Sequence, residues 1–170
     1  MTTTDISNQS ELVGFWNRVL APKFIRFRHI LVEGTSNHSA QVLPTLGLRG
    51  GERVIDIGCG FGKTTFSLKR RWPDAEVIGL DLAAPCLKLG RRMATDRGLA
   101  IRWRQGDMEM LPFEDCSIDL AAITMVLHEL PPPAIAVALA EAARVLRPGG
   151  LLVMLENRFL GDPFRDTLLQ

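Results

Sequence analysis

The sequence predicts an α/β protein whose mostly parallel sheet carries helices on both faces. Beyond residue 51, short runs rich in β-branched and aliphatic residues alternate with stretches of helical periodicity. Parallel strands need crossover connections, and a helix in each crossover packs on one face of the sheet. The 170 residues suffice for one domain with its own core.

Five strands and three helices follow from this alternation. We expect strands at residues 53–56, 76–81, 101–105, 118–124 and 151–156. We expect helices at residues 63–71, 85–97 and 133–147. The segment Arg147-Pro148-Gly149-Gly150 is expected to stop the last helix and to form a turn before the fifth strand.

The first 50 residues have a different pattern. Residues 1–10 are mostly polar, so we expect a disordered tail there. Residues 11–50 are expected to form an N-terminal helical cap, because apolar residues from Leu12 to Leu31 recur at spacings of three and four. Pro22 should divide this cap into two short helices. Residues 51–170 then hold the sheet.

Composition argues against several kinds of partner and location. The 20 Lys and Arg residues nearly balance the 19 Asp and Glu residues, so nucleic acid is not expected as a partner. No apolar run approaches the roughly 18 residues of a membrane span. Cys59, Cys86 and Cys116 match neither a disulfide framework nor a zinc site. A reducing cytoplasm is therefore the expected location.

A glycine-rich loop follows the first expected strand and opens the first expected helix. It reads Asp56-Ile57-Gly58-Cys59-Gly60-Phe61-Gly62. Glycine lets the backbone come close to a ligand, and a helix N-terminus offers free N–H donors. In a parallel sheet this loop lies at the carboxyl ends of the strands, where ligands bind. The loop alone suits several nucleotides.

Three other known motifs each fail at a particular position of this sequence. A dinucleotide-binding loop, G-x-G-x-x-G, needs glycine where Lys63 stands. A phosphate-binding P-loop needs glycine where Ile57 stands. The pair His128-Glu129 lacks the second histidine of a zinc protease helix, and prolines follow it from Pro131. No metal site is expected.

Three acidic residues follow three of the expected strands at nearly even spacing. Asp56, Asp81 and Asp107 lie 25 and 26 residues apart. They belong to the glycine loop, to Glu-Val-Ile-Gly-Leu-Asp-Leu at 76–82 and to Gln-Gly-Asp-Met at 105–108. Together these segments resemble the motifs of class I S-adenosylmethionine (SAM) dependent methyltransferases. The resemblance covers roughly residues 51–156 and implies a three-layer, Rossmann-like sheet.

The resemblance implies SAM as the cofactor and S-adenosylhomocysteine as its product. It implies that Asp81 binds the ribose hydroxyls and that Asp107 binds the adenine amine beside Met108. Asp56 would face the methionine ammonium, directly or through water. Further implied cofactor contacts are Gly58, Cys59, Gly60, Gly62, Leu82 and Thr124. The alternatives are a helix N-cap for Asp81, a turn carboxylate for Asp107 and a loop-amide acceptor for Asp56.

Residues for the methyl acceptor are expected after the fourth and fifth strands. His128 is the candidate catalytic residue, because an imidazole titrates near neutral pH and suits proton removal. A histidine bonded to the backbone is the alternative. Glu129, Asn157 and Arg158 are further candidates for the acceptor side. The expected function is methyl transfer to a small molecule, as in the ubiquinone and menaquinone biosynthesis group, or else SAM binding without independent catalysis.

Members of the resembled family continue past the fifth strand with a helix and an antiparallel strand pair. Here only residues 160–170 follow, so the domain at 51–170 is expected to be truncated after the fifth strand. That strand would be a sheet edge with unpaired backbone groups. Either the chain is a fragment, or another subunit or the N-terminal segment covers this edge. A homo-oligomer formed through the edge is the partner that this strand position predicts.

Overall fold

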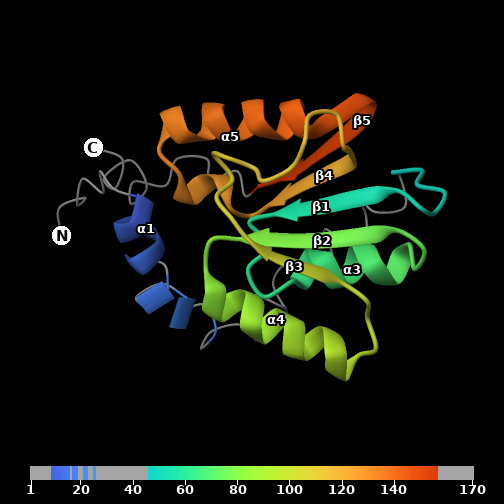
Figure 1. The fold of residues 1–170 in the computed structure, drawn as a ribbon, viewed down its shortest axis with the longest axis horizontal. Coiled ribbons are helices and arrows are strands. Elements are labelled where there is room, and N and C mark those ends of the chain that lie inside the picture. The colour runs from blue at the N-terminus through green and yellow to red at the C-terminus, as the bar shows by residue number, and fades with distance from the viewer. Residues whose placement is uncertain (1–8, 16, 19–20, 23–24, 26–45, 157–170) are drawn as a thin grey trace.

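The computed structural model describes residues 9–15, 17–18, 21–22, 25 and 46–156. These residues form a five-stranded sheet with helices on both faces, α5 above it and α3 and α4 below it in Figure 1. The predicted α/β class is confirmed. Within the described part of the chain, no helix is long and apolar enough to cross a membrane.

The elements alternate along the chain as the pattern predicted. In order they are α1 (Gln9–Phe15), β1 (Arg53–Ile57), α3 (Lys63–Arg71), β2 (Glu76–Asp81), α4 (Ala84–Asp96), β3 (Arg102–Gln105), β4 (Ile118–Thr124), the 3-10 helix η3 (Leu127–Glu129), α5 (Pro132–Val145) and β5 (Leu146–Leu155). All strands are parallel, in the order β3-β2-β1-β4-β5. The order reverses between β1 and β4, where such sheets bind ligands.

Most element limits agree with the prediction to within one or two residues, and two segments differ more. The expected turn at 147–150 is wrong, because α5 ends at Val145 and β5 begins at once with Leu146. Ile118 pairs with Leu146 and Leu120 with Leu151, so residues 147–150 bulge opposite one residue of β4. The expected tail at 1–10 is wrong for its last two residues, which begin α1. Residues 1–8, most of the expected cap and residues 157–170 lie outside the described residues.

The core lies on both faces of the sheet, as alternating side chains require. On β1, Ile55 and Ile57 face α5 and pack with Ala138, Ala142 and Val145. Val54, which precedes Ile55 in the strand, packs on the other face with Leu68 and Trp72 of the α3 side. Each such buried aliphatic side chain contributes about 1.5–3 kcal/mol to folding. The middle of the sheet is therefore buried on both faces.

Gly62, the third glycine of the loop, packs against the ring of Trp103. Trp103 of β3 lies edge to face with Phe66 of α3, with ring centroids 5.9 Å apart. The ring fills a slot whose walls are glycines: a Cβ on Gly90 would lie 2.7 Å from it, and one on Gly79 3.0 Å. A Cβ on Gly62 would overlap the same ring. The absence of a side chain at Gly62 therefore lets the loop pack closely against β3.

We expect Gly62→Ala to cost more stability than Gly98→Ala. Both glycines have positive φ, 96° at Gly62 and 63° at Gly98, so both substitutions carry a backbone cost of about 1–2 kcal/mol. At Gly98 no atom lies within 4 Å of the new Cβ, whereas at Gly62 it meets Trp103 and adds an overpacking cost of about 1–3 kcal/mol. Urea unfolding measures the difference, and equal losses would contradict the packing role.

Candidate functional site

The parallel sheet brings the predicted cofactor residues to one edge. The glycine loop follows β1, Asp81 ends β2 and Leu82 follows it, and Thr124 ends β4. Asp107 and Met108 follow β3. The carboxyl ends of β1 and β4 flank the switch point, and those of β2 and β3 continue the same edge beyond β1. The predicted positions therefore share one side of the fold, while their contacts with a cofactor stay predictions.

Asp81 connects the end of β2 to the glycine loop. One carboxylate oxygen, Oδ2, accepts the Gly60 N–H at 2.6 Å, and Oδ1 accepts the Ala83 N–H at 2.8 Å. Burial raises the pKa of Asp81, and the two amide hydrogen bonds oppose the rise. The backbone adds a further link, because the Cys59 N–H donates to the Leu80 carbonyl at 2.9 Å. The loop is therefore attached to the end of β2 both through a side chain and through the backbone.

The middle of the loop is open. Gly60 has a φ of 54°, and no atom lies within 4 Å of the position that a Cβ would take. Gly58 differs, because a Cβ there would lie 2.7 Å from the Val126 side chain after β4. Close backbone approach to a ligand is thus available at Gly60, directly beside the Asp81 carboxylate.

Asp56 lies beneath the loop. Its residue is 1% exposed, and the Thr65 hydroxyl of α3 donates to its Oδ2 at 2.5 Å. Burial raises its pKa to about 7; the Thr65 hydrogen bond opposes the rise, and the charge of Asp81 adds to it. The carboxyl thus bonds a side chain rather than the loop amides that the alternative interpretation named. Its expected role toward an ammonium stays a prediction, and burial favours the route through water.

The other predicted residues take structural positions that are compatible with a cofactor wall. Asp107 accepts the Glu109 N–H at 2.9 Å, as a turn carboxylate does. Met108 is 9% exposed and packs in the core cluster with Leu80. Cys59 is buried, and burial raises the pKa of its thiol well above the ordinary value. This thiol is therefore no nucleophile at neutral pH.

His128 lies in a carboxylate cluster that the sequence did not reveal. Its Nδ1 lies 2.8 Å from Glu156 Oε2, and its Nε2 lies 3.9 Å from Glu129 Oε1. Glu156 follows β5, and its role is visible only once β4 and β5 are paired. Asn157 and Arg158, the other expected residues here, lie outside the described residues. Across the described chain, no group of three or more His, Cys, Asp or Glu residues could hold a metal.

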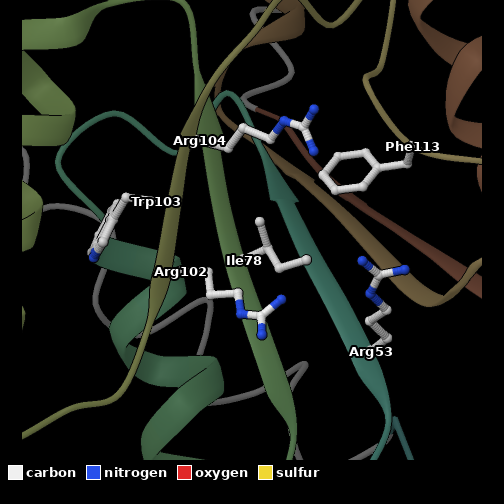
Figure 2. Close-up of a pocket in the computed structure, with 6 residues that line it drawn as sticks. All are labelled: Arg53, Ile78, Arg102, Trp103, Arg104 and Phe113. Atoms are coloured by element: carbon white, nitrogen blue, oxygen red, sulfur yellow. The ribbon is translucent and has the colours of Figure 1, made fainter.

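A separate groove of about 320 Å³ lies on the sheet face (Figure 2). Its floor is Ile78 of β2, and Arg53, Arg104 and Phe113 surround it. The guanidinium carbons of Arg53 and Arg104 lie 5.9 Å and 5.2 Å from the Phe113 ring centroid, and Arg102 pairs with Glu76 at 2.7 Å. Its arginines thus have partners within the fold, and the groove lies along the strands rather than at their carboxyl ends.

Asp56 should make folding stability depend on pH. Its pKa is about 7 in the folded protein against an ordinary 3.8, so the folded state binds the proton more tightly. The resulting stability is present in full below about pH 4 and is lost as pH rises through about 7. We compare the unfolding free energy of Asp56→Asn with that of the wild type at pH 4.5 and at pH 8. The difference should shift in favour of the variant by about 2–4 kcal/mol from the lower pH to the higher.

Urea unfolding at the two pH values measures this difference. Asp74→Asn is the control, because it makes the same chemical change at an exposed carboxyl. For this control, the difference in unfolding free energy from the wild type should change by less than about 0.5 kcal/mol between the two pH values. An equal gain for Asp56→Asn at both pH values would contradict the shifted titration.

Comparison with known proteins gives the same family that the motifs suggested. A family model described as a methyltransferase domain matches residues 54–150. A demethylmenaquinone methyltransferase from Lactiplantibacillus plantarum is 40% identical over 155 residues, 89% of this chain and 65% of the relative. A ubiquinone/menaquinone biosynthesis C-methyltransferase from Dinoroseobacter shibae is 40% identical over 120 residues, 69% of this chain and 47% of the relative. The chain spans less than two thirds of these relatives' length.

Solved structures agree on the fold. The YcgJ protein from Bacillus subtilis has a TM-score of 0.68 at 29% identity, over 78% of this chain and 56% of that one. Geranyl diphosphate methyltransferase in complex with SAM has a TM-score of 0.64 at 27% identity, over 71% of this chain and 48% of that one. The family model covers more than half of the 170 residues, and the protein belongs to the class I SAM-dependent methyltransferases, with similarity to the enzymes of quinone biosynthesis.

Proposed function

We propose that the chain binds SAM and transfers its methyl group to a small-molecule acceptor. The observation that carries the proposal is the Asp81 carboxylate beside the open Gly60 backbone, at the switch point of the sheet. A carboxylate at a strand end can accept hydrogen bonds from both hydroxyls of a ribose. An unfilled glycine position lets the methionine part of the cofactor lie against the loop backbone. The similarity to quinone methyltransferases favours a quinol-like acceptor.

The residues present fit the cofactor in its separate parts. Asp81 would hold the ribose, Asp107 the adenine amine beside Met108, and Gly58 and Gly60 the methionine part. Asp56 would act on the ammonium through water, since its own carboxyl is buried on Thr65. Cys59, Gly62, Leu82 and Thr124 complete the proposed wall. The sulfonium carbon is electrophilic when bound, so the chain needs chiefly to position the acceptor and to accept its proton.

Calorimetry on Asp81→Ala tests the cofactor site. We expect SAM and S-adenosylhomocysteine to bind at least about 100-fold more weakly, because hydrogen bonds to a carboxylate contribute about 1.5–3 kcal/mol each. NAD and ATP should bind neither protein, since their loop patterns are missing. Asp96→Ala, on the exposed end of α4, is the matched control and should leave SAM affinity unchanged. Unchanged SAM affinity in Asp81→Ala would refute the site.

Radiolabelled methyl transfer separates an enzyme from a binding subunit. The wild-type chain with methyl-labelled SAM should move label into the small-molecule fraction of a metabolite extract or into reduced 1,4-naphthoquinone. SAM binding with no transfer to either would refute independent catalysis and leave the cofactor site standing.

We propose a cytoplasmic location and a homo-oligomer formed through β5. The location is supported by Cys59, Cys86 and Cys116, which form no disulfide. The oligomer is supported by the position of β5 at the end of the sheet order, together with exposed apolar side chains on it. Leu151 is 42% exposed and Met154 52%.

Light scattering tests the edge. We expect the wild type to be a dimer or larger at tens of micromolar, and Met154→Lys to shift it toward monomer because a charge on the edge opposes pairing. Met110→Lys is the matched control, since Met110 is 66% exposed but follows β3. A monomeric wild type would overturn this proposal.

A further inference from the structure

Glu156 fixes the backbone that carries His128. Its Oε1 accepts the Val126 N–H at 2.6 Å and the Leu127 N–H at 2.7 Å. The preceding residue, Met125, has a φ of 56° and donates its N–H to the Leu155 carbonyl at 2.7 Å. The turn after β4 is therefore attached to the end of β5 at three backbone amides.

The other oxygen of Glu156 determines the tautomer of His128. Oε2 lies 2.8 Å from Nδ1 of the imidazole. An ionised carboxylate can only accept hydrogen bonds, so Nδ1 must carry the proton. In the neutral ring this leaves Nε2 with a free lone pair that can accept a proton.

The carboxyl of Glu129 lies near the free nitrogen of His128. Nε2 lies 3.9 Å from Glu129 Oε1, beyond hydrogen-bond distance. Burial raises the pKa of Glu129 to about 7; His128 lowers it, and the charges of Asp81 and Glu156 raise it further. The thiol of Cys86 on α4, whose pKa burial raises to about 12, interacts with the same carboxyls. Asp81 and Glu129 thus share one electrostatic environment at the edge of the glycine loop.

We propose that His128 is the general base of methyl transfer and that Glu156 is its positioning residue, which implies an acceptor with an acidic hydroxyl or carbon. The inference rests on the proposed function. The acceptor's O–H or C–H proton passes to Nε2, its electron pair forms the bond to the methyl carbon, and the pair of the broken S–CH3 bond stays on the sulfur of S-adenosylhomocysteine. Glu156 stabilises the resulting imidazolium through Nδ1–H.

Nitrogen NMR on the wild type and Glu156→Gln tests the tautomer without any acceptor. The chain has three histidines, so the His128 signals can be assigned with His128→Gln. We expect the neutral wild-type ring to carry its proton on Nδ1. In Glu156→Gln the amide oxygen can still accept the two backbone N–H groups, while the amide NH2 faces Nδ1 and moves the proton to Nε2. Glu129→Gln is the control and should keep the wild-type tautomer.

Rates of labelled methyl transfer, measured as above, test catalysis. Glu156→Gln should lower the rate about 100-fold or more, since Nε2–H cannot accept the proton, while SAM affinity stays within about twofold. His128→Ala should lose a similar factor and regain part of it with added imidazole.

The outcomes separate this inference from the proposed function. A wild-type ring protonated on Nε2, or a Glu156→Gln protein with the wild-type rate, would overturn the dyad even where SAM binds and is used. A wild type that binds no SAM would overturn the proposed function instead. A parallel loss of SAM affinity in Glu156→Gln would assign Glu156 a purely structural role.

Discussion

The site depends on one interaction, the hydrogen bonds between the Asp81 carboxylate and two backbone amides. Gly60 donates to it from the loop after β1, and Ala83 donates from the start of α4. A partly buried carboxylate loses hydration, so its ionised form is favoured only where nearby donors replace water. The loop and the helix supply these donors, and the same carboxylate then faces the open position at Gly60. Geometry and charge are thus set together.

Buried acidity extends from this point across the strand ends. Asp56 lies under the loop, Asp81 beside it and Glu129 after β4, and burial raises the pKa of each. Each of these carboxyls therefore keeps its proton to a higher pH than a carboxyl in water does. A positive charge placed beside them would favour their ionised forms.

The sequence predicted most of the fold because local patterns carried it. The limits of β2 and β4 are as predicted, since both are short buried runs bounded by turn residues. The bulge at 147–150 was missed because Pro148 and the following glycines are typical of a turn, and only pairing with β4 shows that they stay in the sheet. Gly62 was assigned to a ligand, but its contact with Trp103 depends on β3, which lies 40 residues further along the chain.

The same reasoning explains why the sequence did not predict Glu156 as a site residue. His128 and Glu156 are 28 residues apart, and no spacing rule relates the ends of neighbouring parallel strands. Their contact exists because β4 and β5 end at the same height, which the bulge at the start of β5 sets by shifting the register. The irregular segment therefore has a consequence at the opposite end of the sheet: without those extra residues a different side chain of β5 would lie opposite the turn at His128.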